Sequence, residues 1–205
     1  PWAEDSFLFI GPGPLNGTFC PSTRASFVNQ SVHTGLISHA EVGGHFGNEI
    51  KWAGWDGIYI KGKSKKPVWL SIKDDKVEIR DASKMWGKDT ETAEEMILKE
   101  MKDPYARTAV IGPAGENMIP YAAVIVERTR AAARTSTGAL MGNKKLKAIS
   151  VRGTKAVPTV DPAKFTEAAK LSLQYNVDRE AWQGIKRWGT GGLLELKNWV
   201  SGSLI

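Results

Sequence analysis

Short apolar segments separated by glycine and proline turns dominate the chain up to Gly153, and they constrain the fold more than any other feature. Such segments, rich in β-branched and aromatic residues, predict β-strands rather than long helices. The Lys73–Lys76 segment lies between two of them and predicts a hairpin connection. We expect strands at residues 7–10, 58–60, 68–72, 77–80, 108–111, 122–126 and 149–151.

Helical patterns occupy two other regions. Residues 90–101 carry apolar side chains at helical spacing and acidic residues in the first turns, which predicts a helix. A second helix is expected after Asp161, because Asp161 suits an N-cap and Pro162 the first helical position. Three acidic residues of the first helix are expected to form a solvated face rather than paired catalytic carboxylates: Glu91, Glu94 and Glu95.

The change from strand to helix patterns divides the chain. Residues 182–205 predict a further helix and its connections, so the sequence beyond about residue 158 is helical throughout. We therefore expect an α+β domain over residues 1–153 and the beginning of an all-α domain over residues 154–205.

The composition excludes several classes of protein. The 205 residues contain one cysteine, Cys20, so the chain has no internal disulfide framework and cannot build an iron–sulfur cluster by itself. No segment approaches the roughly 20 apolar residues that a membrane helix needs. The first residues lack the basic and apolar regions of a signal peptide. We expect a cytoplasmic protein without a membrane span.

A net charge of +6 favours an anionic partner. The basic residues gather in three parts of the sequence, Lys61–Lys66, Arg128–Arg134 and Lys144–Lys147. None of these clusters has the spacing of a zinc finger, a basic zipper or an RNA-recognition motif. Nucleic-acid binding is therefore disfavoured, and a basic surface that only meets water is an open alternative.

Three glycine-rich segments are candidates for binding an anion. They are Gly13–Thr18, which Arg24 follows; Gly43–Gly47; and Arg130–Arg134, which Gly138 and Gly142 follow. Glycine lets backbone N–H groups approach an anion closely, and arginine offers paired donors to phosphate. The known phosphate-binding fingerprints of nucleotide-binding loops are absent. The segments predict either a shared site for another phosphorylated cofactor or three simple turns.

Longer segments, taken in their order along the chain, are more specific than any one turn. They are residues 13–18, 43–56, 60–63, 86–88, 111–117, 130–134 and 138–149. In this order and spacing they resemble the N-terminal domain of the aldehyde ferredoxin oxidoreductases. The resemblance runs from Phe9 to Gly153 and continues weakly through Trp188–Thr190.

The resemblance implies a fold and an activity. The family's N-terminal domain consists of two β-sheets related by a pseudo-twofold axis, which form a base for a bis-pterin cofactor of tungsten or molybdenum. The whole enzyme would oxidise an aldehyde to a carboxylic acid and pass electrons through a [4Fe–4S] cluster to ferredoxin or another electron-transfer protein. A homodimer or additional subunits are further expected partners.

The resemblance also implies that part of the family's sequence lies outside this chain. About fifty residues are expected to be missing at its start, and the helical domain is expected to be truncated. The cysteines of the [4Fe–4S] cluster and the catalytic acid and histidine belong to those later domains. This chain alone is therefore expected to hold the cofactor without a complete active site.

The resemblance assigns roles to individual residues. Arg24 would contact the pterin, while Arg130 and Arg134 would contact its phosphates. The backbone carbonyls of Glu41 and Ala131 would bind a Mg²⁺ ion that bridges two phosphates. The predicted cofactor-binding set is Arg24, Glu41, Gly43, Gly44, His45, Arg130, Ala131, Ala133 and Arg134.

Two residues depart from the family pattern. Glu41 stands where an asparagine is usual, and its carboxylate would repel phosphate unless a cation screens it. Ala133 replaces a glycine, which matters only if the position needs positive φ. Two alternatives stay open: a pterin-binding module without catalytic activity and, less favoured, a basic nucleic-acid-binding domain.

Overall fold

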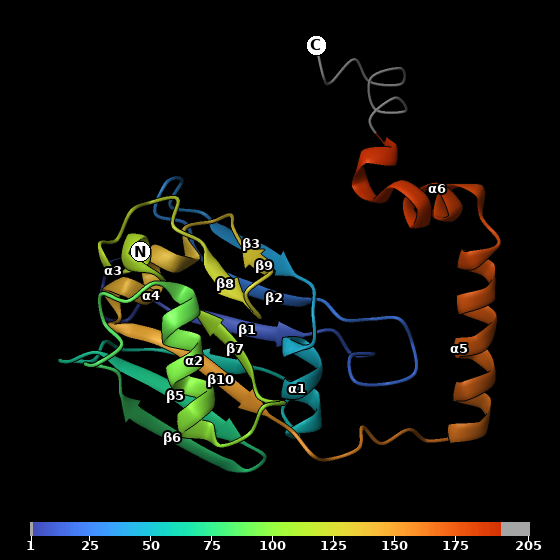
Figure 1. Ribbon diagram of the computed structural model, residues 1–205, viewed down its shortest axis with the longest axis horizontal. Coiled ribbons are helices and arrows are strands. Elements are labelled where there is room, and N and C mark those ends of the chain that lie inside the picture. The colour runs from blue at the N-terminus through green and yellow to red at the C-terminus, as the bar shows by residue number, and fades with distance from the viewer. Residues whose placement is uncertain (1, 194–205) are drawn as a thin grey trace. The chain divides into compact units, whose positions relative to one another are not determined.

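The computed structural model describes residues 2–193, which form two compact units (Figure 1). The first unit comprises residues 1–18 and 22–158, and the second comprises residues 19–21 and the chain from Thr159 onwards. No helix within the described residues is long and apolar enough to cross a membrane.

A four-stranded antiparallel sheet in the order β3-β2-β1-β4 forms one layer of the first unit. Its strands alternate between buried and more exposed residues, as period-two side chains on a half-buried sheet do. Leu8, Ile10 and Phe27 thereby enter the core. The strands are β1 (Leu8–Pro12), β2 (Ala25–Gln30), β3 (Ile37–Val42) and β4 (Ile58–Ile60).

A six-stranded mixed sheet in the order β6-β5-β10-β7-β8-β9 forms the second layer. The central strand β10 pairs in parallel with β5 and antiparallel with β7. A shift of register between Leu146 and Ala148 lets Leu146 face the same core as Ile149, three residues later. The strands are β5 (Val68–Lys73), β6 (Lys76–Asp81), β7 (Arg107–Val110), β8 (Val124–Val126), β9 (Arg130–Ala132) and β10 (Leu146–Arg152).

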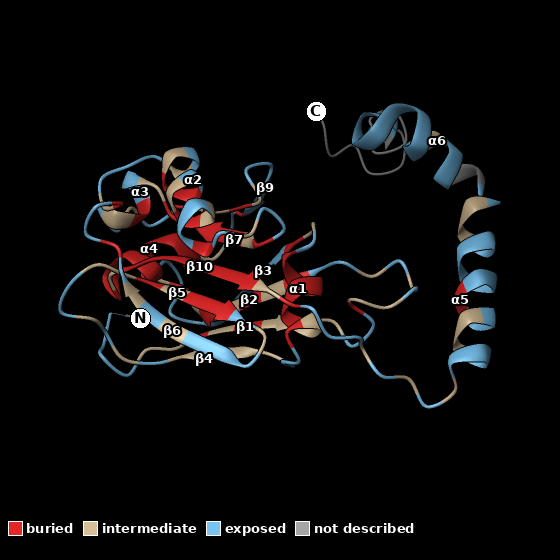
Figure 2. Ribbon diagram, turned by 60° about the horizontal axis from the view of Figure 1, so that its bottom comes forward, coloured by how far each residue is buried: buried red, intermediate tan, exposed pale blue. Residues whose placement is uncertain are grey.

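The main core lies between the two sheets, and Figure 2 shows the buried residues concentrated on their central strands. Phe27 of β2, Phe46 of α1 (Phe46–Trp52) and Val151 of β10 belong to this core. A second core lies between the larger sheet and α2 (Thr90–Met101), where Trp69 of β5 is fully buried. Helix α2 therefore covers the face of the larger sheet that does not meet the smaller one.

Short helices complete the first unit, and longer ones form the second. Helices α3 (Pro113–Glu116) and α4 (Thr137–Asn143) pack against each other. The second unit contains α5 (Pro162–Val177), α6 (Glu180–Trp188) and a 3₁₀ turn, Gly189–Leu193. The Asp161 carboxylate caps α5 by accepting a hydrogen bond from the Lys164 N–H at 3.0 Å, as the sequence predicts.

Most of the predicted elements are confirmed, and the architecture is α+β with two sheets. All seven predicted strands are present within a few residues, and the predicted helix over 90–101 is α2. Strands β2, β3 and β9 and helices α1, α3 and α4 were not predicted. The pseudo-twofold axis stays a prediction, and the part of the predicted C-terminal helix beyond residue 193 lies outside the described residues.

Candidate functional site

Two of the three glycine-rich segments lie at neighbouring positions of the fold. Gly43–His45 is the loop that leads from β3 into α1. Arg130–Arg134 comprises β9 and the two residues that follow it, and β9 lies beside β3 (Figure 1). The fold therefore brings a glycine loop and a pair of arginines to one region of the domain, although they are about ninety residues apart in sequence.

The segment of Arg130–Arg134 corrects one expectation. The sequence predicted a turn here, whereas Arg130–Ala132 is a strand paired with β8. Arg130 and Ala131 are exposed in it, and Ala133 and Arg134 are exposed after it. Ala133 is not among the residues with positive φ, so the replacement of glycine causes no backbone strain.

Arg130 and Arg134 are available to a ligand. Within residues 2–193, neither side chain forms a hydrogen bond or an ion pair, and both residues are exposed. A guanidinium group presents up to five N–H donors in a fixed plane and keeps its charge at all ordinary pH values. Two such groups beside a glycine loop form a suitable surface for phosphate.

Arg24 and Glu41 lie side by side on the smaller sheet. Arg24 immediately precedes β2, whose first residue, Ala25, is opposite Val42 of β3. The Arg24 Nη1 atom is 3.7 Å from Glu41 Oε2, and both side chains are largely exposed. The carboxylate of Glu41 is therefore offset by a neighbouring cation, which reduces the repulsion that it would exert on a phosphate.

The Gly43–His45 loop has an open side and a packed side. A Cβ atom built on Gly43 meets no other atom within 4 Å, and the φ of Gly43 is not positive, so neither packing nor conformation requires glycine there. Gly44 has φ +102°, which glycine adopts far more readily than other residues. A side chain at Gly43 would extend into the open space, and a bare backbone there leaves room for a ligand.

These features fit a phosphorylated cofactor. Three cationic side chains lie on elements next to the glycine loop: Arg24 before β2, Arg130 in β9 and Arg134 after β9, toward the other end of β3; His45 in the loop is exposed. Only one predicted site residue, Glu41, is acidic. Among the described residues, no group of three His, Cys, Asp or Glu side chains is arranged as a metal site. A cation held here by this chain would accordingly rely on backbone carbonyls and the phosphates themselves.

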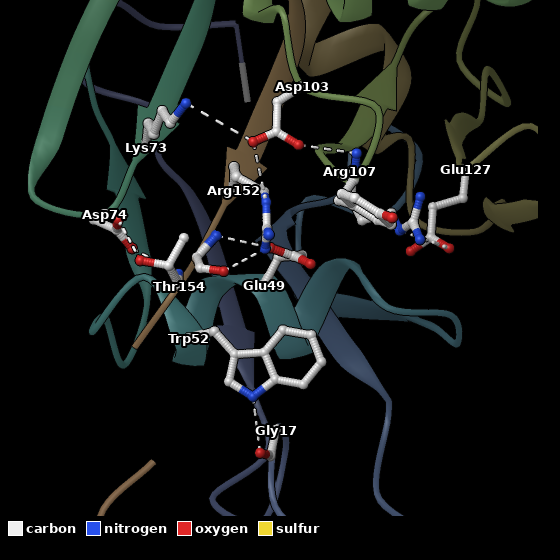
Figure 3. A network of polar contacts seen from close by, with 12 residues as sticks. Gly17, Glu49, Trp52, Lys73, Asp74, Asp103, Arg107, Glu127, Arg152 and Thr154 are labelled. Atoms are coloured by element: carbon white, nitrogen blue, oxygen red, sulfur yellow. Dashed lines mark hydrogen bonds and ion pairs between the residues drawn. The ribbon is translucent and has the colours of Figure 1, made fainter. Parts of the chain in front are cut away.

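The first glycine-rich segment supports the site without being part of its open surface. The Asn48 side chain accepts a hydrogen bond from the Gly17 N–H at 3.0 Å, and Trp52 Nε1 donates to the Gly17 carbonyl at 2.8 Å (Figure 3). Asn16 Nδ2 donates to the Arg24 carbonyl at 3.0 Å. The segment thus fixes the backbone of Arg24 against α1, and its own part in binding a ligand stays a prediction.

The glycines after Arg134 have a packing role. Gly138 and Gly142 lie in α4, and a Cβ atom on Gly142 would be 1.8 Å from the Gly115 carbonyl oxygen of α3. On Gly138 it would be 2.6 Å from the carbonyl oxygen of Ala122. These distances are far below van der Waals contact, so the two glycines allow α4 to pack closely against α3 and its neighbouring loop.

We expect Gly142→Ala to lower the free energy of unfolding by about 1–3 kcal/mol, because the new methyl group forces α4 away from α3. Gly184→Ala in α6 is the matched control, since a Cβ atom there meets nothing within 4 Å. Urea unfolding of both variants measures the difference. Equal stability of the two variants would contradict the packing role of Gly142.

Parts of two of the three basic clusters form internal pairs, while Arg130 and Arg134 of the second cluster stay exposed. Lys144 and Lys147 are buried, and Lys147 Nζ donates to the Lys88 carbonyl at 2.7 Å and forms an ion pair with Glu116. Arg128 pairs with three carboxylates of α2, at 3.2–3.3 Å, from Glu91, Glu94 and Glu95. The Lys61–Lys66 loop is the cluster whose lysines are exposed, as predicted for a strand-end loop.

The same contacts correct the expectation of a solvated acidic face for Glu94 alone. The Glu94 side chain is 9% exposed and accepts a hydrogen bond from Thr108 Oγ1 at 2.8 Å. Glu91 and Glu95 are exposed, as predicted, and also pair with Arg128, so the three acids anchor the turn before β9 to α2. Because Lys144, Lys147 and Arg128 are used in internal contacts, part of the positive charge is not available to an anionic partner.

A buried polar network around Glu49 connects α1 to the end of β10 (Figure 3). Glu49 Oε2 accepts from the Gly153 N–H at 2.7 Å and pairs with Arg152 Nη1 at 3.2 Å. Burial raises the pKa of the Glu49 carboxyl above its ordinary value, while the Gly153 N–H and Arg152 act in the opposite direction. Arg152 also contacts Asp103 at 3.3 Å, so α1 is tied to β10 and to the segment after α2.

The sequence did not single out Glu127, Arg107 or the Glu49–Arg152 pair. Each is an isolated charged residue in a strand, helix or turn, and no local pattern distinguishes it from a surface residue. Their positions depend on contacts between segments distant in sequence, such as Glu127 with His45. The geometry as a whole defines an α+β domain that offers a phosphorylated cofactor a glycine loop and three arginines.

Comparison with known proteins identifies the family. Residues 1–153 match the model of the aldehyde ferredoxin oxidoreductase N-terminal domain. The chain therefore belongs to this family, as the motifs predict.

Similar proteins include oxidoreductases of two archaea. The chain is 45% identical over 200 residues to a tungsten-containing aldehyde ferredoxin oxidoreductase of Thermococcus kodakarensis, covering 97% of this chain and 33% of the relative. It is 34% identical over 209 residues to an aliphatic sulfonate oxidoreductase, WOR-like subunit, of Pyrococcus furiosus, covering 93% of this chain and 32% of that protein. The chain thus spans about a third of the length of these curated relatives.

A solved structure shares the fold. The active-site complex BamBC of benzoyl coenzyme A reductase, bound to 1,5-dienoyl-CoA, contains a chain that superposes with a TM-score of 0.85 at 39% identity. The match covers 88% of this chain and 28% of that one. The relatives are thus oxidoreductases by name, and this chain has the fold of the matched part of that solved chain.

Proposed function

We propose that this chain is the cofactor-binding portion of a tungsten- or molybdenum-pterin oxidoreductase that oxidises an aldehyde to a carboxylic acid. The observation that carries the proposal is a pair of exposed, unpartnered arginines, Arg130 and Arg134, on and after the strand β9 that lies beside β3 and its open Gly43 backbone, in a member of this family. The names of the archaeal relatives support tungsten as the metal.

The residues of the site have distinct tasks in this proposal. Arg130 and Arg134 bind the phosphates of the pterins, and Arg24 contacts a pterin while its charge is shared with Glu41. Gly43 and Gly44 let the cofactor approach the backbone, and His45 closes that side of the site. The backbone carbonyls of Glu41 and Ala131 would hold a Mg²⁺ ion, which would neutralise phosphate charge, while Ala133 continues the same surface.

When bound, the metal–pterin group supplies the two-electron oxidation, and a [4Fe–4S] cluster outside this chain passes the electrons on. In the net reaction, the aldehyde and one water would give the carboxylic acid, two protons and two electrons. The residues of this chain orient the group, neutralise its phosphates and limit the access of water. Ferredoxin is the proposed acceptor, and the multi-component names of two relatives support additional subunits.

Metal analysis of the natively purified protein tests this function. We expect tungsten or molybdenum in a fixed ratio to the polypeptide, together with pterin released on denaturation. Inductively coupled plasma mass spectrometry measures the metal, and fluorescence of the oxidised pterin measures the organic part. A folded protein with neither metal nor pterin would contradict the proposal. Pterin without turnover of any aldehyde would favour a binding module that is not an enzyme.

A further inference from the structure

We propose that Glu127 is a positioning residue that holds the Gly43–His45 loop at a fixed place beside β9. The proposal rests on the function proposed above, because its consequence is to keep the two halves of the phosphate site together. It concerns a residue outside the predicted cofactor-binding set, and it follows from the contacts of one carboxylate.

The backbone of Glu127 is fixed by the turn in which it lies. Glu127 begins the three-residue turn between β8 and β9 and has φ +50°. Its N–H donates to the Thr108 carbonyl at 3.1 Å, and its own carbonyl accepts from the Thr129 N–H at 2.6 Å. The next residue, Arg128, anchors the turn to α2 through three carboxylates. The turn is therefore held on two sides.

The side chain of Glu127 extends from this turn to the glycine loop. Its Oε1 atom accepts a hydrogen bond from the His45 N–H at 2.6 Å. A Cβ atom on Gly44 would be 3.0 Å from Oε1 and 3.2 Å from Oε2. Gly44 is thus required both by its positive φ and by the close approach of the carboxylate. The turn before β9 and the loop after β3 are connected directly.

The charge of Glu127 is offset by Arg107 of β7. The Arg107 Nε atom lies 4.0 Å from Glu127 Oε2 and is buried without a hydrogen bond of its own among the described residues (Figure 3). The Glu127 side chain is 16% exposed. A carboxylate partly removed from water and paired in this way repels a neighbouring phosphate less than a free one.

The hydrogen bond of Glu127 sets the distance between the Gly43–His45 loop and β9. Arg130 follows Glu127 by three residues on the same hairpin. Gly43 and Gly44 immediately precede His45, whose N–H donates a hydrogen bond to the Glu127 carboxylate. Any displacement of the loop relative to β9 must break this hydrogen bond. Glu127 therefore maintains the spacing between the glycine backbone and the phosphate-binding arginines without itself touching the ligand.

Substitution of Glu127 in the natively purified, full-length protein tests the proposal. We expect Glu127→Ala to lower tungsten and pterin per folded chain by on the order of tenfold, since a hydrogen bond to a charged acceptor is lost. Glu127→Gln keeps an oxygen acceptor for His45 and is expected to restore most of the content. Amide hydrogen exchange at residues 43–46 provides a second readout that needs no cofactor, and it should accelerate in Glu127→Ala alone.

Asp74→Ala is the matched control, because Asp74 lies in the β5–β6 turn with φ +50° and also accepts a backbone N–H, that of Thr154 at 2.7 Å, away from the loop. It should accelerate exchange at Thr154 and leave cofactor per folded chain unchanged. Equal cofactor content in Glu127→Ala and the wild type, or an equal loss in both alanine variants, would overturn the role of Glu127. Absence of the cofactor from the wild type would instead contradict the proposed function, whatever the exchange rates show.

Discussion

Replacing Arg130 and Arg134 together with alanine should reduce the pterin and tungsten content of the purified protein by well over tenfold. Each guanidinium is exposed and has no partner within the described residues, so neither is needed to stabilise the fold. A charge-assisted hydrogen bond to phosphate contributes about 1.5–3 kcal/mol, and every 1.4 kcal/mol changes an equilibrium about tenfold. The loss should therefore appear in cofactor content while the unfolding midpoint is nearly unchanged.

Lys61→Ala/Lys84→Ala is the control, because both lysines are exposed, neither has a hydrogen bond or ion pair among the described residues, and the charge change is equal. It should retain the cofactor. A double lysine variant at Arg130 and Arg134 keeps the charge but loses the planar, bidentate donors, so an intermediate content is expected. If the alanine double variant retained full cofactor, the assignment of the phosphate site would fail.

The predictability of the fold varied with the local chemistry of each segment. Segments such as Val68–Ile72 were found because β-branched and aromatic residues lie between clear turn signals. Strand β3 was missed because His39 and Glu41 interrupt its apolar pattern, and they do so because its outer face is exposed. Helix α1 was hidden by Gly47, whose absent side chain makes room for Asn16. A glycine that serves packing cannot be distinguished locally from one that reverses the chain.

The candidate site was predictable only through resemblance. Arg24, Gly43 and Arg130 are separated by long stretches of sequence, and the contact of β3 with β9 brings two of these segments together. Local periodicity carries no information on that contact, because it arises from the packing of two different sheets. The partners of Arg128 illustrate the same limit: its pairing with α2 turned an expected solvated face into a structural anchor.

Lys147→Met should be among the most destabilising single substitutions in the first unit, lowering the free energy of unfolding by about 3–5 kcal/mol. The Lys147 side chain is 0% exposed and that of Glu116 is 5% exposed. Glu116 Oε2 also accepts from the Gly87 N–H at 2.7 Å, so the carboxylate cannot leave without breaking a second contact. Removing the ammonium therefore leaves a buried negative charge without its cation.

The double variant Lys147→Met/Glu116→Gln separates the charge from the shape of the site. Glutamine can still accept the Gly87 N–H, and no uncompensated charge remains, so most of the lost stability should return. Urea unfolding followed by circular dichroism measures both variants. A single variant within about 1 kcal/mol of the wild type would contradict this prediction, and would show that water or a proton reaches the Glu116 carboxylate in place of the lysine. A double variant as unstable as the single one would place the cost in packing around Lys147 instead of in the unpaired carboxylate.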